Sequence, residues 1–364
     1  MSLRSLLPEW TIRRARRLWD NYGVLWLGAI CVGFVSVAYA KIIDHGFELF
    51  RGIVAHGFWL PLIITPAGTA LATWLTRRCF PGAEGSGIPQ VIATLQDGRL
   101  APRLLSLRIM FGKIVGSFIG ILSGLTIGRE GPTVQIGASL MYAMRKGYRR
   151  SSAQIEHQLA LAGAAAGLAA AFNTPLAGVV FAIEELSRSF VARSSGALIT
   201  AIIFSGVVAL GLQGNYLYFG RIQAITDFQW ALVPTLIGAG VLTGVAGGLF
   251  CWLLLNVARW MPQRLQQLRR ERPVAFAAGC GLVIAVIGLV SGGVTFGSGY
   301  AEARSLLDSH ETLNPAYALL KFGALIASYL SGIPGGIFAP SLAIGAGLGN
   351  AMAHLSSVIA LPAL

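Results

Sequence analysis

The sequence predicts an all-α polytopic membrane protein, and three features of its composition carry that prediction. Hydrophobic residues make up 55% of the 364-residue chain and charged residues only 12%, about half the usual fraction of about 25%. The mean hydropathy is +0.67. The chain contains 46 glycines, which lie within apolar stretches, where glycine allows close helix packing or a broken helix. A soluble enzyme is excluded because too few polar residues are present to cover a water-facing globule.

The formal net charge of +13 does not indicate a nucleic-acid-binding protein. Much of the excess lies in short basic runs that flank apolar segments, which is the distribution of cytoplasmic loops in membrane proteins. The segment 1–21 is therefore expected to be cytoplasmic. The runs are Arg13, Arg14, Arg16 and Arg17; Arg77 and Arg78; and Arg264, Arg269, Arg270 and Arg272.

Eight apolar runs are expected to enter the bilayer. The first, 22–40, has 19 residues without charge, which is long enough to cross the hydrocarbon core. Proline or glycine interrupts several others, and a break at 332–336 divides the last one, so tilted, short and discontinuous helices are expected. Lys113 interrupts one run and is expected to pair or to extend to the interface. The later runs are 52–76, 109–127, 159–183, 195–220, 228–257, 274–300 and 322–364.

Two motifs recur at nearly constant spacing and predict an internal repeat. The segment 128–138 matches 336–346 at an offset of 208, and Gly-Ser-Gly at 85–87 recurs at 297–299 at an offset of 212. We expect one transmembrane domain over 1–364, with repeats at about 22–213 and 228–364. Paired Gly/Pro-interrupted segments of this kind place an ion site where the repeats converge. The second repeat is shorter, so the chain is expected to be C-terminally incomplete.

Ser86, Gly87 and Ile88 form the first candidate site. A hydroxyl between glycines just before Pro89 is typical of a helix N-terminus, where exposed amides bind anions. A capped helix start without a ligand explains the same residues.

Arg129, Glu130 and Gly131 form the second candidate site. Charges between apolar stretches are costly and usually functional, so Glu130 is expected to compete with an anion and to take up a proton. A structural Arg129–Glu130 pair is the alternative. Ile337 and Phe338 have similar Gly/Pro surroundings without charge.

Glu184 and Glu185 end an apolar run. Acidic residues at such a helix end either contact water at the membrane interface, or one of them is the ionisable group that a proton path needs. The five histidines and four cysteines have no ligand spacing, so no metal and no cofactor is expected.

Taken in order, Gly-Ser-Gly-Ile-Pro, Gly-Arg-Glu-Gly-Pro-Thr-Val-Gln-Ile-Gly, Ala-Phe-Asn-Thr-Pro-Leu-Ala-Gly and Gly-Gly-Ile-Phe-Ala-Pro resemble the CLC family of chloride channels and proton-coupled chloride transporters. The resemblance implies two inverted repeats, a homodimer with one anion pore in each subunit, and cytoplasmic termini. It implies that the Ser86 hydroxyl and the amides of Ile337 and Phe338 bind chloride, and that amides around Arg129–Gly131 line an outer site.

The resemblance also assigns roles to two acids. Glu130 matches the gating glutamate and Glu185 the internal proton-transfer glutamate, which favours an antiporter. The pore tyrosine of the family would lie beyond the end of this sequence.

The expected function is H⁺/Cl⁻ exchange across the inner membrane of a bacterium, by a protein that is not an enzyme and whose partners are chloride, protons and the lipid bilayer. A passive Glu-gated chloride channel and an inactive truncated fragment remain alternatives. A metal-dependent intramembrane enzyme is opposed by the absence of a matching motif.

Overall fold

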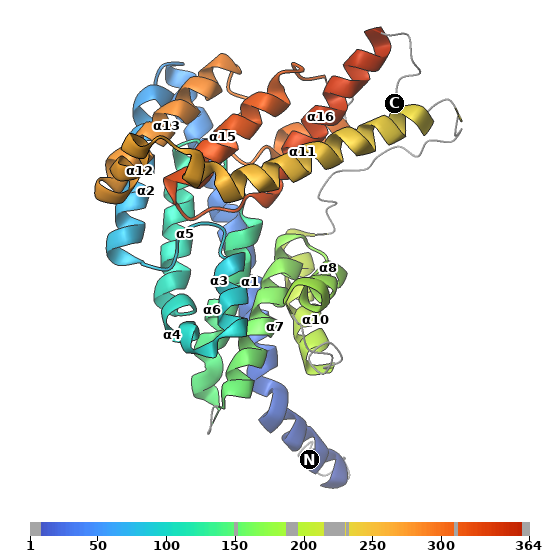
Figure 1. Cartoon of the computed structure of the whole chain (residues 1–364). Coiled ribbons are helices and arrows are strands. Elements are labelled where there is room, and N and C mark those ends of the chain that lie inside the picture. Colours follow the sequence, from blue (N-terminus) through green and yellow to red (C-terminus); the bar gives the residue numbers. More distant parts are fainter. Residues whose placement is uncertain are drawn as a thin grey trace. The chain divides into compact units, whose positions relative to one another are not determined.

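The predicted fold class is confirmed. The computed structural model describes residues 9–148, 152–186, 196–214, 230, 233–308 and 312–358, and within these ranges helices are joined by turns and isolated backbone bridges, without strands (Figure 1). The first eight residues and the junction at 215–229 between the expected repeats lie outside the described residues.

The chain divides into two compact units, each made of three separate segments. The first unit comprises Met1–Ala40, Gly87–Phe111 and Thr133–Asn215, and the second comprises Lys41–Ser86, Gly112–Pro132 and Tyr216–Leu364. Helices that cross these bounds contribute to both units. The expected division into consecutive repeats is a division by sequence and stays a prediction.

Helix α1 is much longer than the apolar run that predicted it. It extends over Glu9–His56, because the charged residues that end the run, Lys41 and Asp44, have exposed side chains and do not interrupt a helix. The expected cytoplasmic segment is therefore helical from Glu9 onward.

Four helices among the described residues are long and apolar enough to cross a membrane, and a fifth span is a pair of helices bent by 53°. The remaining apolar helices are shorter or interrupted, as the glycine and proline content predicts. The spans are Tyr22–His56, Gly196–Gln213, Leu236–Val257, Pro273–Val290, and the pair Gly98–Leu104 with Leu107–Leu122.

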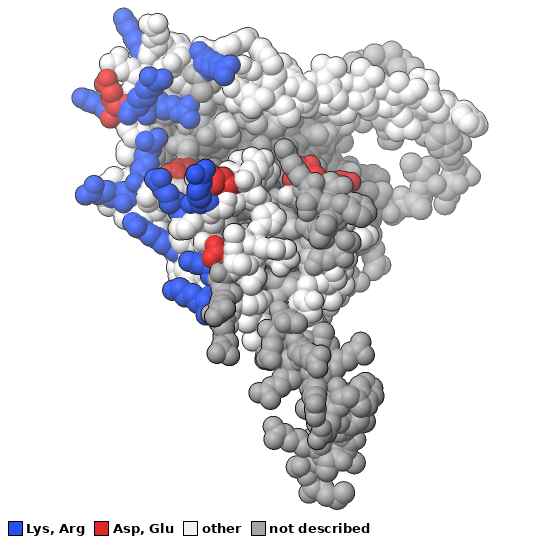
Figure 2. All heavy atoms as spheres, turned by 60° about the horizontal axis from the view of Figure 1, so that its bottom comes forward, with Lys and Arg blue, Asp and Glu red and all other residues white. Residues whose placement is uncertain are grey.

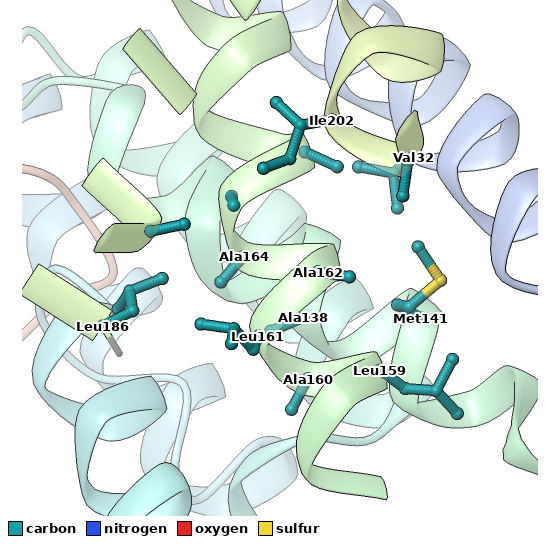
Figure 3. Close-up of a cluster of buried hydrophobic side chains, with 14 of the residues drawn as sticks. Val32, Ala138, Met141, Leu159, Ala160, Leu161, Ala162, Ala164, Leu186 and Ile202 are labelled. Atoms are coloured by element: carbon teal, nitrogen blue, oxygen red, sulfur yellow. The ribbon is translucent and has the colours of Figure 1, made fainter. Parts of the chain in front are cut away.

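The first unit is built around α7, whose buried part consists of alanine, glycine and leucine. Thirteen consecutive residues of α7, from Leu159 to Ala171, are buried, and Figure 3 shows their small side chains among those of α1, α6 and α10. The helices of this unit are α3 (Ile88–Gln96), η2 (Gly98–Leu100), α4 (Ala101–Leu104), the body of α6 (Glu130–Ala143), η3 (Met144–Gly147), α7 (Ala153–Ala171), α8 (Pro175–Phe181), the π turn η4 (Ala182–Leu186) and α10 (Gly196–Gln213).

Helices α6 and α7 approach so closely at Gly137 and Gly163 that no side chain fits at either position. A Cβ on Gly163 would collide with the carbonyl oxygen of Gly137, and a Cβ on Gly137 would collide with that of Gly163. We therefore expect Gly163→Ala to lower the free energy of unfolding by about 1–3 kcal/mol, as overpacking generally does, measured by denaturant titration in detergent.

A matched control is Gly211→Ala in α10, where an added Cβ meets nothing within 4 Å. In a helix this change stabilises by about 0.5–1 kcal/mol. Equal stability of the two variants would contradict the close approach of α6 to α7.

The second unit packs α13 against α2 and α15, and α16 against α15, α14 and α11. On α13 a Cβ at Gly281 would lie 2.6 Å from Thr69 Oγ1 and 2.8 Å from Thr65 O, so α2 and α13 also meet at a glycine. The helices are α2 (Pro61–Cys79), α5 (Leu107–Leu122), α11 (Val233–Trp260), α12 (Gln263–Glu271), α13 (Pro273–Val290), α14 (Tyr300–Asp308), α15 (Tyr317–Ser331) and α16 (Phe338–Val358).

Basic residues lie at helix ends, as the charge pattern predicts. Arg77 and Arg78 occupy the last turn of α2, and Arg269 and Arg270 the last turn of α12. Figure 2 shows Lys and Arg in groups on the described surface, separated by uncharged areas.

Candidate functional site

Two backbone bridges in the second unit, each made of two hydrogen bonds, join the motif loops of the two expected repeats. The Gly85 N–H donates to Ile333 O, and the Gly335 N–H donates back to Gly85 O, both at 3.0 Å. Gly128 and Gly336 exchange hydrogen bonds of 2.6 and 2.7 Å. Because Gly128 and Gly336 are equivalent positions of the 208-residue repeat, the repeated motifs meet at the same place in the fold.

Ser86 and Glu130 lie beside these bridges. A Cβ on Gly131 would collide with Ser86 Oγ, so the serine hydroxyl faces the backbone of the Gly128–Pro132 loop. The Glu130 side chain is 2% exposed. A Cβ on Gly128 would lie 2.5 Å from Glu130 Oε2 and 3.3 Å from the backbone nitrogen of Ala339. The carboxylate and the first turn of α16 therefore both border Gly128.

The site combines helix starts with a carboxylate. Helix α6 begins at Glu130 and α16 at Phe338, and the first N–H groups of a helix have no partner within it. The Phe338 ring is 46% exposed and Ile337 is partly buried. Gly87 and Ile88 continue the chain from Ser86 into the first unit, where Gly87 is the N-cap of α3 with φ of 99°.

Arg129 pairs with a residue that the sequence did not suggest. Its Nη1 lies 2.7 Å from both carboxylate oxygens of Asp44 in α1. The Arg129 side chain is 14% exposed and that of Asp44 is 64% exposed. The sequence gives no indication of this contact across 85 residues, because Asp44 belongs to none of the motifs.

Glu130 and Arg129 line a cavity of about 210 Å³ within the second unit. Late residues of α1 form one wall, and the segment that starts α14 forms another. The charged lining residues are Asp44, Glu48, Arg51, Arg129, Glu130 and Glu302, and the α14 segment contributes Ser298 to Glu302.

The structure corrects the expectation that Lys113 could extend to the membrane interface. Its side chain is fully buried, and Nζ donates to Gly85 O at 2.9 Å and to Glu84 O at 3.4 Å. The lysine therefore holds the loop that carries Ser86.

Glu185 lies in the first unit, on the π turn Ala182–Leu186 that follows α8, and both Glu184 and Glu185 are exposed. Exposure suits either of the roles considered for these acids. Among the described residues, no group of three His, Cys, Asp or Glu side chains could hold a metal ion.

Comparison with known proteins assigns the chain to a family. The family model described as "Voltage gated chloride channel" matches residues 68–363. The chain belongs to the voltage-gated chloride channel family.

Relatives and solved structures agree with this assignment. The chain is 31% identical over 357 residues to the H⁺/Cl⁻ exchange transporter ClcA of Salmonella typhimurium strain LT2, covering 92% of this chain and 73% of the relative. A ClcA from Salmonella arizonae is also 31% identical, over 347 residues, covering 92% of this chain and 68% of the relative.

Two solved structures establish the CLC fold. A slow cyanobacterial Cl⁻/H⁺ antiporter superposes with a TM-score of 0.77 at 24% identity, over 94% of this chain and 81% of that one. A CLC-type fluoride/proton antiporter gives 0.74 at 23% identity, over 93% and 82%. The CLC resemblance of the motifs is thus confirmed. The protein is a multi-pass membrane protein of a family of channels and transporters, not of enzymes.

Proposed function

We propose that this protein exchanges chloride for protons across a bacterial inner membrane, as a homodimer with one anion path in each subunit. One observation carries the proposal: Ser86, Glu130 and the start of α16 border the same two backbone bridges. The curated relatives named H⁺/Cl⁻ exchange transporters support the choice of ions.

The chemistry of the site suits a small anion. The hydroxyl of Ser86 and the amides of Gly87, Ile88, Gly131, Ile337 and Phe338 offer donors without a permanent charge, and amides at helix starts favour anions. Chloride bound by such dipoles can also leave, because neutral donors hold an anion less strongly than an ammonium or a guanidinium does. Arg129, held by Asp44, provides positive charge at the rim.

Glu130 would gate this path by competing with chloride. Its ionised carboxylate occupies an anion position, and protonation removes its charge and releases it, which couples one proton to the movement of chloride. Glu185 would pass protons to the cytoplasmic side, and its exposure is what such a transfer requires.

The runner-up is a passive chloride channel gated by Glu130, and a fragment that does not transport is the third possibility. The same measurement separates all three. The purified protein is placed in proteoliposomes, a chloride gradient is imposed, and proton movement is followed with a pH-sensitive dye. An exchanger drives protons against their gradient, a channel passes chloride alone, and an inactive fragment moves neither ion.

Anion selectivity is expected to depend on Ser86. Its hydroxyl donates to the anion and faces Gly131, so Ser86→Pro removes a donor that favours compact chloride over nitrate. We expect the nitrate-to-chloride flux ratio to rise by about tenfold, the value of one hydrogen bond of about 1.4 kcal/mol.

The matched control is Ser86→Ala, which removes the same hydroxyl without the backbone constraint of proline. This variant should raise the ratio to a similar extent, because the lost donor is the same. Equal ratios in the wild type and Ser86→Pro would place the selective site elsewhere.

A further inference from the structure

The connection between α11 and α13 contains the short polar helix α12, whose leucines line an apolar cavity (Figure 1). The cavity has a volume of about 550 Å³ and lies within the second unit, between the end of α11, α12, α13 and α15. None of the described residues that line it is charged. Because water finds few hydrogen-bond partners in such a space, the cavity suits an apolar occupant.

The cavity opens to the surface beside a membrane span. Val283 lines it from the span Pro273–Val290 and is 50% exposed, and Leu265 on α12 is 43% exposed. Gly279, one turn before Val283, also lines the cavity, and a Cβ added there would meet nothing within 4 Å. A lipid acyl chain can therefore enter from the bilayer without displacing a side chain.

Helix α12 carries leucines and arginines on one face. Four residues share this face at helical spacing, namely Leu265, Leu268, Arg269 and Arg272. The two leucines line the cavity. Arg269 is partly buried and lies close enough to Cys280 in the cavity wall to interact electrostatically with its thiol. The guanidinium of Arg269 therefore lies at the edge of the cavity.

The charge around this edge is strongly positive. The segment 259–272 contains five arginines and one acid, Glu271. The Oε1 atom of Glu271 accepts a hydrogen bond of 2.8 Å from Gln267 Nε2 within α12. A guanidinium binds phosphate oxygens through its planar fork of N–H groups, so this edge is complementary to the headgroup of an anionic lipid.

Contacts with the end of α11 hold α12 in place. The Nε2 atom of Gln266 donates to Met261 O at 2.7 Å and to Arg259 O at 3.2 Å. Trp260 lines the cavity, is 68% exposed and packs edge-on against Trp252, with ring centroids 4.6 Å apart. Exposed tryptophans are typical of the membrane–water interface, which is the depth at which lipid headgroups lie.

We propose that α12 and this cavity bind one anionic phospholipid, with an acyl chain in the cavity and the phosphate on Arg269. Basic residues beside a membrane span attract anionic lipids even without a cavity. The cavity adds the burial of apolar surface, which a headgroup contact alone lacks. The inference goes beyond the proposed function and does not depend on which ions the protein moves.

Native mass spectrometry of the full chain in detergent measures this binding. The protein is titrated with phosphatidylglycerol or with phosphatidylcholine of the same acyl chains, so that the two lipids differ in headgroup and net charge. We expect the first bound phosphatidylglycerol to have an affinity about fivefold higher than that of phosphatidylcholine, which is the effect of one basic residue near an anionic lipid.

The headgroup contact is tested by two neighbouring arginines. Arg269→Gln should remove the preference for phosphatidylglycerol. Arg270→Gln is the matched control, because it removes the same charge from the opposite side of α12 and should leave the preference in place.

The acyl-chain contact is tested by filling the cavity. Gly279→Leu should lower the affinity for both lipids by about tenfold or more, because the burial of two or three CH₂ groups already accounts for this factor. Gly248→Leu on α11 is the matched control, since Gly248 also has open space at its Cβ position but does not line the cavity. It should bind both lipids like the wild type.

Three results would overturn the lipid site. They are equal affinities of the wild type for the two lipids, unchanged binding in Gly279→Leu, and equal losses in Arg269→Gln and Arg270→Gln, which would indicate attraction by surface charge alone. All four substituted positions are exposed or partly exposed, and the melting temperature without added lipid reports whether each variant folds. Failure of the protein to move chloride would refute the proposed function and leave this inference standing.

Discussion

Glu130→Gln should abolish proton movement while chloride still passes. Glutamine has nearly the shape of glutamate but can neither carry the negative charge that competes with chloride nor take up a proton. The side chain is 2% exposed and borders Gly128 and the start of α16, so its carboxylate lies at the junction of the motifs. We expect chloride-driven proton uptake to fall by about 100-fold or more, and chloride flux to lose its dependence on pH.

The matched control for this variant is Glu302→Gln. Glu302 lines the same cavity but belongs to no motif that meets the backbone bridges. Its substitution should leave proton coupling intact. If Glu130→Gln still moved protons in response to a chloride gradient, Glu130 would not be the gate.

Glu185→Gln should stop proton movement and leave the pH response of chloride flux in place. The two acids act at different points, so removing the internal one blocks the delivery of protons but leaves the Glu130 carboxylate in place to gate chloride. The loss of coupling should again be about 100-fold, measured with the same dye, and chloride flux should be retained.

Glu184 provides a control at the adjacent position. It is exposed on the same π turn, so Glu184→Gln reports any effect of removing charge from this turn. Full proton pumping by Glu185→Gln would remove the internal-acid assignment and favour a passive channel. Equal defects in both variants would point to surface charge rather than to a specific proton donor.

The convergence of the motifs could be predicted from the sequence, because it depends on backbone requirements that leave a visible pattern. Gly128 and Gly336 exchange backbone hydrogen bonds, and a Cβ on Gly336 would lie only 3.0 Å from Gly128 O, so this approach favours glycine. This need for glycine explains why the matching glycines recur at an offset of 208 residues. The helix starts at Ile88, Glu130 and Phe338 likewise follow from glycine and proline nearby.

Contacts made by long side chains could not be predicted in this way. Arg129 reaches Asp44 across 85 residues, and neither residue type specifies its partner. The length of α1 was also missed, since exposed charged residues end an apolar run without ending a helix. Lys321 did leave a signal, because it repeats Lys113 at the offset of the glycine motifs. Only the structure shows what the two lysines have in common, since the Nζ atom of each donates to backbone carbonyls.

The backbone bridges also determine when the protein can become functional during its synthesis. Gly85 must wait for Ile333 and Gly335, which leave the ribosome some 250 residues later. Until then the main-chain groups of Gly85 and Gly128 lack these partners in a membrane, where unsatisfied groups are costly. The nascent chain must therefore keep them hydrated or sheltered by the insertion machinery. The junction of the motif loops is completed last, and a stop codon before residue 335 would leave Gly85 and Gly128 without these backbone hydrogen bonds.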